Sequence, residues 1–295
     1  MASKQNEWKY PESIVSCEWL RKRLPDKSIR IFDCTTYLHY ADKDTSKPYD
    51  VESGFKNYKM GHIPNAAFLD IQKKLSNNDS RFKFTIPDYD LLVKSLQELG
   101  IGDPFHIILY SGNGIQWATR VWWLIFVLGF KKVSILNGGI KEWKRLGYDL
   151  EKGERKHKPA KFIPCIDKTV FVDKKRTYDS INQDKCILLN ALTSDIHRGE
   201  NSRYGRLGRI PGSKNIPFVE LVDSKQKFIS PDKAQAIFEN QNIDKKTRVL
   251  NYCGGGIAAT LNAFVLRQLG IEKLEIYDNS MSEWAMDHNL PIERS

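Results

Sequence analysis

Cysteine is scarce in this chain of 295 residues, and the five cysteines stand far apart, at positions 17, 34, 165, 186 and 253. No C-x-x-C pair occurs, so the sequence predicts neither a disulfide scaffold nor a zinc ribbon. The six histidines also lack the spacing of metal ligands, and we expect no metal and no other cofactor. Any cysteine chemistry must therefore belong to a single thiol.

Long hydrophobic runs are absent as well. The longest, residues 121–130, is about ten residues long, whereas a helix needs about 20 apolar residues to cross a bilayer. Residues 1–6 are polar and lack the apolar centre of a secretory signal peptide. These features predict a cytoplasmic protein with reduced thiols and no membrane partner.

The sequence also lacks a block of one charge. Lysine and arginine total 46 against 36 aspartates and glutamates, and the resulting net charge of +10 is spread over both halves. A field of this sign favours small anionic ligands. Nucleic acid is the alternative partner, but no nucleic-acid-binding module is recognisable, and we predict no such partner.

An internal repeat divides the chain into two copies. The length corresponds to about two domains of roughly 100–200 residues each. Three blocks of the first half return in the same order about 140 residues later. The pairs are residues 61–64 and 208–211, residues 110–115 and 252–257, and residues 136–143 and 277–284. A period of this length indicates duplication of a whole domain.

Each copy alternates short apolar runs with helical stretches. Strands that alternate with helices predict an α/β fold, in which each copy is a mostly parallel sheet flanked by helices. We place the first domain at residues 1–150, a linker with a charged, solvated start at 151–168, and the second domain at 169–295. The runs of strand length are residues 29–32, 106–110 and 133–136, and then 186–189, 248–252 and 274–277.

Cys253 differs from the other cysteines in its local sequence. It follows an expected strand at residues 247–252 and precedes a helix that begins near Ala258, with three glycines in between. Such a turn directs backbone N–H groups and the positive end of the helix dipole at one point, and glycines let the backbone curl around it. We predict a lowered pKa for this thiol and a cradle for a persulfide or an oxyanion. The cradle residues are Gly254, Gly255, Gly256, Ile257 and Ala258.

Two interpretations of this turn stay open. Cys253 is either a nucleophile or a small buried side chain at the end of a strand, with the glycines forming a tight turn. Cys34 and Cys186 lie at or in apolar strands and are expected to be inert. The first copy has Ser111 at the position of Cys253, so it has the loop without the thiol.

Several motifs together resemble a known family, the tandem rhodanese-type sulfurtransferases. The resemblance runs from about residue 15 to residue 284 and implies a silent first domain and a catalytic cysteine in the second. It also implies a cycle in which Cys253 takes sulfur from a small anionic donor and holds it as a persulfide. The acceptor would be a thiol, cyanide or a thioredoxin-like protein. The motifs are the duplicated architecture, residues 61–64, 120–123, 137–139 and 208–212, and the Cys253 loop.

The residues after Cys253 bear on the identity of the donor. Family members that prefer thiosulfate resemble Cys-Arg-Lys-Gly, and those that prefer mercaptopyruvate resemble Cys-Gly-Ser-Gly. This loop has no cation and is similar to the second type, with Gly255 in place of the serine. The same subfamily has an acidic residue where this chain has Gln72. We favour 3-mercaptopyruvate over thiosulfate, and expect Gly255→Ser to raise turnover if a missing hydroxyl limits proton transfer.

Arginines of the second domain are the candidates for donor binding. By the resemblance, Arg198 and Arg203 stand where the family binds the substrate carboxylate. A guanidinium pairs with a carboxylate or thiosulfonate through two parallel hydrogen bonds. The alternative is a solvated basic loop that also contains Arg206 and Arg209.

The predicted function is sulfur transfer through Cys253 by a two-domain enzyme. The main alternative is a persulfide carrier or binding module with little turnover of small donors. A cysteine phosphatase or arsenate reductase would need an arginine six residues after the cysteine, where this chain has Ala259. Turnover of 3-mercaptopyruvate or thiosulfate separates the enzyme from the carrier.

Overall fold

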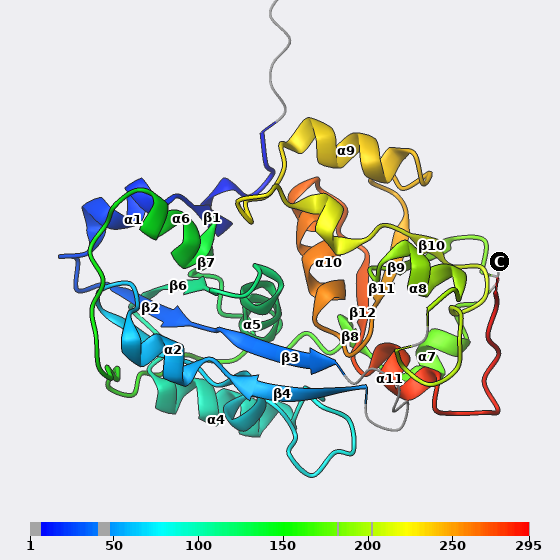
Figure 1. The fold of residues 1–295 in the computed structure, drawn as a ribbon, viewed down its shortest axis with the longest axis horizontal. Coiled ribbons are helices and arrows are strands. Elements are labelled where there is room, and N and C mark those ends of the chain that lie inside the picture. Colours follow the sequence, from blue (N-terminus) through cyan, green and yellow to red (C-terminus); the bar gives the residue numbers. More distant parts are fainter. Residues whose placement is uncertain (1–6, 41–47, 182, 202, 295) are drawn as a thin grey trace, which may run out of the picture.

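The computed structural model describes residues 7–40, 48–181, 183–201 and 203–294, which form two α/β units (Figure 1). Each unit is built on a five-stranded sheet whose neighbouring strands are all parallel. The first sheet has the order β1-β7-β6-β2-β5, and the second has the order β8-β12-β11-β9-β10. The two orders match strand for strand, which confirms the predicted pair of parallel-sheet units.

The three inner strands of each sheet lie where the apolar runs predict them. The edge strands have two or three residues, which is too short to give a period in the sequence, and they were not predicted. The first sheet contains β1 (Ile14–Val15), β2 (Ile29–Asp33), β5 (Ala66–Phe68), β6 (His106–Tyr110) and β7 (Val133–Leu136). The second contains β8 (Phe171–Val172), β9 (Cys186–Asn190), β10 (Lys214–Asn215), β11 (Arg248–Tyr252) and β12 (Leu274–Tyr277).

Helices connect the parallel strands and pack against the sheets, as crossover connections require (Figure 1). No helix in the described part of the chain is long and apolar enough to span a membrane. The first unit has η1 (Pro11–Ser13), α1 (Cys17–Arg23), α2 (Phe55–Met60), α3 (Ile71–Lys74), α4 (Tyr89–Leu99), α5 (Gln116–Phe126) and α6 (Gly139–Arg145). The second has α7 (Lys174–Tyr178), α8 (Ser194–Arg198), η2 (Phe218–Leu221), α9 (Pro231–Glu239), α10 (Ala258–Gln268) and α11 (Ser280–Trp284).

An antiparallel hairpin of the first unit extends towards the second (Figure 1). Its strands are β3 (Thr36–Tyr40) and β4 (Tyr49–Ser53), paired so that Tyr40 lies opposite Tyr49. The two tyrosine rings pack edge to face with their centroids 6.0 Å apart. The hairpin was not predicted, and it is the element that brings side chains of the first unit to the cysteine loop of the second.

Helices α5 and α10 join the two units through a shared apolar core. The Trp122 ring packs edge to face on Phe264 at 4.9 Å, and the Trp123 indole donates a hydrogen bond to the Thr260 carbonyl at 3.0 Å. All four residues are fully or almost fully buried, and the three aromatic ones belong to a cluster that draws on both sheets. Burial of such large rings strongly favours a fixed arrangement of the two units.

The segment predicted as a linker has two parts. Residues 152–156 are exposed, in agreement with their charge. Further on, the Ala160 amide donates to the Gln97 carbonyl and the Cys165 amide to the Leu128 carbonyl, both at 2.9 Å. Phe162 is buried against Phe130, so from residue 160 the segment packs along the first unit instead of running through solvent.

A charged cluster also connects the units. The Glu142 carboxylate, 2% exposed, accepts hydrogen bonds from Arg145 Nε at 2.6 Å on its own helix and from Lys227 Nζ at 2.5 Å in the second unit. The Arg145 hydrogen bond above all, with that from Lys227, lowers the pKa of Glu142 to about 2, although burial acts in the opposite direction.

We expect Glu142→Gln to lower the free energy of unfolding by about 2 kcal/mol at pH 7. A carboxylate with a depressed pKa stabilises the fold above its unfolded pKa of about 4.3 and loses this contribution as the pH falls towards its folded pKa. The difference between variant and wild type should therefore shrink to less than half between pH 7 and pH 3. Urea unfolding at both values measures it, and a difference independent of pH would contradict the ion-pair explanation.

Candidate active site

The Cys253 loop is the turn between β11 and α10, as predicted. Three hydrogen bonds fix it to the start of α11: the Cys253 amide donates to Ser280 Oγ at 3.0 Å, the Met281 amide to the Cys253 carbonyl at 3.0 Å, and the Ser282 amide to the Gly254 carbonyl at 2.7 Å. The thiol-bearing residue is only 2% exposed. The loop is therefore held rigidly, with Cys253 away from bulk solvent.

Apart from the Cys253 amide, the backbone N–H groups of this loop have no acceptor among the described residues. In the described part of the chain, the N–H groups of residues 254–258 donate no hydrogen bond to a protein acceptor. Helix α10 starts directly behind them without a side-chain cap. Unpaired N–H groups at a helix N-terminus form a site for an anion. The turn can therefore hold a thiolate, a persulfide or a substrate oxyanion.

The corresponding loop of the first unit is filled by its own hydroxyl groups. The Gly112 amide donates to Thr35 Oγ1 at 2.8 Å, and the Asn113 amide donates to Ser111 Oγ at 3.1 Å. Because these donors are already paired, the first loop offers less to an anion, in addition to lacking the thiol. The contrast agrees with the implied silence of the first copy.

Cys253 lies in a cavity of about 80 Å³ between the two units. The β3–β4 hairpin and α5 form one side, and the β9–α8 turn, η2 and the cysteine loop form the other. Most of the lining is aromatic or aliphatic, with one arginine. The lining residues are Leu38, Tyr40, Tyr49, Gln116, Trp117, Leu192, Thr193, Arg203, Tyr204, Phe218, Cys253, Gly254, Gly255, Ile257 and Ala258.

The two arginines predicted to bind the donor lie in different places. Arg203 lines the cavity, with its guanidinium 3.9 Å from the centre of the Tyr40 ring. Arg198, with a side chain 48% exposed, pairs with Glu200 through Nε at 2.6 Å and through a second nitrogen at 2.8 Å, and it is not among the lining residues. The structure thus brings Arg203 together with Cys253, and Arg198 with Glu200.

The other two arginines of the basic loop hold backbone and carboxylate groups. Arg206 donates to four carbonyl oxygens, including those of Ala285 and Leu290, and Arg209 pairs with Glu293. These contacts fasten the loop to the C-terminal segment. The interpretation of this segment as a solvated basic loop is therefore wrong, because at least Arg206 and Arg209 bind other parts of the protein.

The glycines after Cys253 are packed closely by tyrosines. A Cβ atom on Gly254 would collide with the Tyr204 hydroxyl. A Cβ atom on Gly255 would lie 2.5 Å from the Tyr49 hydroxyl and 3.7 Å from Ser282 Oγ. Gly255→Ser therefore meets an occupied position, and the structure gives a reason to expect lower instead of higher turnover from that single change.

Gln72, which stands where the family has an acidic residue, has structural partners. Its Oε1 accepts a hydrogen bond from the Phe84 amide at 3.1 Å, and its Nε2 donates to Asn78 at 3.2 Å. It is not among the residues that line the cavity. Its hydrogen bonds stabilise the loop that carries Phe84, whose carbonyl reaches the domain interface.

The remaining cysteines are poor nucleophiles or lie elsewhere. Burial raises the pKa of Cys17 to about 12, raises that of Cys34 well above its usual range and raises that of Cys186. Cys165 is exposed on the segment that follows the first unit. Cys253, which lines the cavity between the units, stays the predicted nucleophile.

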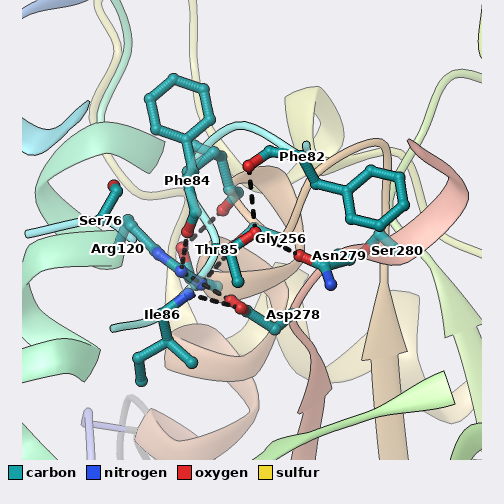
Figure 2. A network of polar contacts seen from close by, with 12 residues as sticks. Ser76, Phe82, Phe84, Thr85, Ile86, Arg120, Gly256, Asp278, Asn279 and Ser280 are labelled. Carbon is teal, nitrogen blue, oxygen red and sulfur yellow. Dashed lines mark hydrogen bonds and ion pairs between the residues drawn. The ribbon is translucent and has the colours of Figure 1, made fainter. Parts of the chain in front are cut away.

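A buried arginine of the first unit reaches the cysteine loop of the second (Figure 2). Arg120, on α5, donates to the Gly256 carbonyl at 3.2 Å, to the Phe84 carbonyl at 2.6 Å and to Asp278 Oδ1 at 2.6 Å. The other Asp278 oxygen accepts from the Ile86 amide at 2.7 Å. This network, the Arg120 clamp, ties the loop, β12 and the first unit together.

Sequence reasoning missed the part of the site that the first unit provides. Tyr40, Tyr49 and Trp117 carry no motif, and their place in the same cavity as Cys253 depends on how two distant segments pack. The alternation of side chains in Thr36–Tyr40 and Tyr49–Ser53 could have indicated a hairpin. Arg120 was part of a quoted motif, but its role as a clamp has no signal in the sequence.

The rhodanese-like domain model matches residues 16–146 and 179–287, which include every strand of both parallel sheets except β1 and β8. These segments make up most of the chain. The chain therefore belongs to the rhodanese-like domain family, with two such domains in tandem.

Named relatives cover nearly the whole chain. The 3-mercaptopyruvate sulfurtransferase of Escherichia coli (strain K12) is 28% identical over 283 residues, 95% of this chain and 97% of that protein. The human 3-mercaptopyruvate sulfurtransferase is 27% identical over 287 residues, 93% and 92% of the two chains. The crystal structure of SseA from Escherichia coli superposes with a TM-score of 0.75 at 25% identity, covering 91% of this chain and 98% of that one. The protein is a sulfurtransferase.

Proposed function

We propose that this enzyme takes a sulfur atom from 3-mercaptopyruvate, holds it on Cys253 as a persulfide and passes it to a thiol or cyanide. The observation that carries the proposal is the Cys253 loop, whose N–H groups at residues 254–258 are unpaired among the described residues and border a small cavity. These donors and the N-terminus of α10 stabilise the negative charge of the thiolate and of the persulfide.

The reaction has two half-reactions. The Cys253 thiolate attacks the sulfur of the donor, an S–S bond forms, and the C–S bond of mercaptopyruvate breaks. The bonding pair leaves with the carbon as the enolate of pyruvate, which takes up one proton. A thiolate or cyanide then attacks the outer sulfur, the S–S bond breaks, and Cys253 is released as a thiolate. No outside oxidant or reductant is needed. The carbon that loses sulfur is reduced by two electrons when mercaptopyruvate becomes pyruvate, and the acceptor is oxidised by two electrons when it receives the sulfur.

The sequence of the Cys253 loop favours 3-mercaptopyruvate over thiosulfate. The loop 254–258 has no cationic side chain to receive the two charges of thiosulfate. Relatives named for 3-mercaptopyruvate, alone or together with thiosulfate, cover nearly all of the chain, and one named for thiosulfate alone covers 95% of it at 26% identity. The alternative, a persulfide carrier with little turnover of small donors, is favoured by Gly255 and Gln72, which replace two groups of the family's proton relay.

A comparison of donors on the wild-type protein tests the proposal. We expect pyruvate release from 3-mercaptopyruvate at a higher kcat/KM than sulfite release from thiosulfate. Without an acceptor, mass spectrometry of the intact protein should find an adduct of about 32 Da, and peptide mapping should place it on Cys253. Loading by a protein persulfide, without turnover of either small donor, would favour the carrier instead.

Arg203 is our candidate for the carboxylate of the donor. Its stacking on Tyr40 fixes the guanidinium at the cavity, and hydrogen bonds to a charged group contribute about 1.5–3 kcal/mol. We expect Arg203→Ala to raise KM for 3-mercaptopyruvate by about 10- to 100-fold and to change kcat little. Arg198→Ala is the matched comparison: a rise in KM there, with none for Arg203→Ala, would return the role to Arg198.

The division of the chain follows from this proposal. We assign residues 1–150 to a silent copy that completes the site, 151–168 to the connection and 169–295 to the copy with the nucleophile. The cytoplasmic location stays a prediction, and one relative, from Arabidopsis thaliana, is named a mitochondrial enzyme. We expect the physiological acceptor to be a small thiol or a thioredoxin-like protein. Loss of the adduct from loaded Cys253 on addition of each candidate would identify it.

A further inference from the structure

Gly255 leaves a space in the loop that a side chain of the other unit fills. A Cβ atom built on Gly255 lies 2.5 Å from the Tyr49 hydroxyl, but 3.8 Å from the ring carbon that bears that hydroxyl. The oxygen of Tyr49 therefore stands beside the position from which a serine at residue 255 would extend. Ser282 Oγ lies 3.7 Å from the same point, so two hydroxyl groups lie near this position.

We propose that Tyr49 is a catalytic residue of the first half-reaction: its hydroxyl donates a hydrogen bond, and then the proton, to the pyruvate enolate that leaves when sulfur moves to Cys253. This inference rests on the function proposed above. Tyr49 and Cys253 line the same small cavity, so a donor whose sulfur contacts Cys253 lies within it. The silent unit thus provides the group that the loop of the other unit lacks.

The position of the Tyr49 side chain suits a proton donor. It is 4% exposed and held between Tyr40 and Phe84, with ring centroids 6.0 Å and 6.4 Å away. Burial raises the pKa of Tyr49, against a smaller opposite effect of the Ser282 hydroxyl, so the phenol stays protonated at neutral pH. A fixed hydroxyl stabilises an oxyanion more than water does, because it needs no reorientation during the reaction.

The proton balance is closed without another reactant. The C–S bonding pair becomes the enolate, the enolate takes the Tyr49 proton, and the product is pyruvate after ketonisation. The resulting phenolate recovers a proton from solvent when pyruvate leaves. Release of sulfite from thiosulfate and discharge of the persulfide to cyanide produce no enolate, and neither step uses this proton.

Tyr49→Phe tests the proposal directly, because it removes one oxygen and keeps the packed ring. We expect kcat with 3-mercaptopyruvate to fall about 10²- to 10³-fold, with KM within about threefold of the wild type. Discharge of a preformed Cys253 persulfide to cyanide should stay within about threefold. Tyr37→Phe is the matched control, since Tyr37 lies on the same hairpin outside the cavity and accepts a hydrogen bond from Asn57.

An exchange of hydroxyl groups provides a second test. Gly255→Ser alone places its Cβ against the Tyr49 oxygen, and we expect kcat to fall. In Tyr49→Phe/Gly255→Ser the obstructing oxygen is gone and the nearest ring carbon is at ordinary contact distance, 3.8 Å. The backbone of Gly255 is not in the left-handed region, so a serine fits it without strain. The double variant should recover at least about tenfold of the turnover that Tyr49→Phe loses.

The outcomes separate this inference from the proposed function. If the wild type converts 3-mercaptopyruvate and Tyr49→Phe keeps its full kcat, Tyr49 is not the donor and the proposed function stands. If the double variant discharges a persulfide normally but loads it no faster than Tyr49→Phe, a serine hydroxyl at residue 255 does not replace that of Tyr49, and the second test contradicts the proposal. If the wild type releases no pyruvate, both the proposed function and the role of Tyr49 fall.

Discussion

Replacement of Cys253 by serine should lower sulfur transfer from 3-mercaptopyruvate by roughly 10⁴-fold or more, because it removes the thiol on which the proposed persulfide forms. The hydroxyl is not ionised at neutral pH and does not form a stable bond to the transferred sulfur. The substitution leaves the shape of the loop almost unchanged, since the contacts of residue 253 to Ser280 and Met281 are made by its backbone. The loss should therefore appear in kcat and in the persulfide adduct, while thermal unfolding stays near that of the wild type.

Cys165→Ser is the control for this experiment. Cys165 is the exposed cysteine among the described residues, so it is the thiol that would react nonspecifically with polysulfide or with an activated donor. We expect it to keep full transfer activity and the adduct on Cys253. Sulfur transfer that survives in Cys253→Ser, or an adduct that disappears in Cys165→Ser, would contradict the assignment of the nucleophile.

The parts of the fold that sequence predicts are those with a local signal. The inner strands, such as Arg248–Tyr252, are apolar runs buried on both faces, and α10 ends close to the glycine that interrupts its pattern. The repeat fixes which strands correspond. The edge strands are too short for a periodic pattern, and they form because a neighbouring strand offers hydrogen-bonding groups. Such pairing depends on tertiary structure, so the sequence of the edge strand alone does not predict it.

The site divides in the same way. Cys253 and its glycines form one continuous segment, so the sequence contains the nucleophile and its cradle together. Tyr49 stands about 200 residues before Cys253, and only the packing of the hairpin against the second unit brings their side chains to one cavity. The two arginines show that a motif does not predict which groups a side chain contacts. Arg198 ends α8 and Arg203 lies only five residues further on, but the Arg198 side chain pairs with Glu200 and the Arg203 side chain stacks on Tyr40.

The first unit has no cysteine at the position of Cys253, but it contributes to the site in two other ways. Its hairpin covers the cavity with tyrosines, and its α5 supplies the Arg120 clamp on the Cys253 loop. Tyr49 of the hairpin lies against Gly255, and Arg120 binds the carbonyl of Gly256, so the two contacts reach adjacent residues of the loop. Gly256 has a left-handed φ of +70°, and a Cβ there would collide with the Asp278 carbonyl, so the loop passes very close to β12. Loss of the clamp should therefore affect stability and catalysis together.

Arg120→Met should lower the free energy of unfolding by about 3–5 kcal/mol, because it leaves the buried Asp278 carboxylate without its cation. It also removes the donors to Phe84 and Gly256. In Arg120→Met/Asp278→Asn the uncompensated charge is gone as well, and stability should return by at least about 1 kcal/mol, since a neutral pair avoids most of the desolvation cost. Urea unfolding of the three proteins measures both effects.

The catalytic part of the same prediction concerns the Cys253 loop. In the folded Arg120→Met protein the Gly256 carbonyl has lost its partner, and we expect the rate of persulfide loading from 3-mercaptopyruvate to fall about tenfold or more, since loop amides stabilise charge only when held in place. Arg30→Met is the matched control, because Arg30 is a buried arginine of the first unit that donates to the Gly100 and Lys158 carbonyls outside the cavity. It should lower stability and leave loading unchanged. Equal loading rates in Arg120→Met and wild type would show that the loop keeps its shape without the clamp, and that Arg120 serves stability alone.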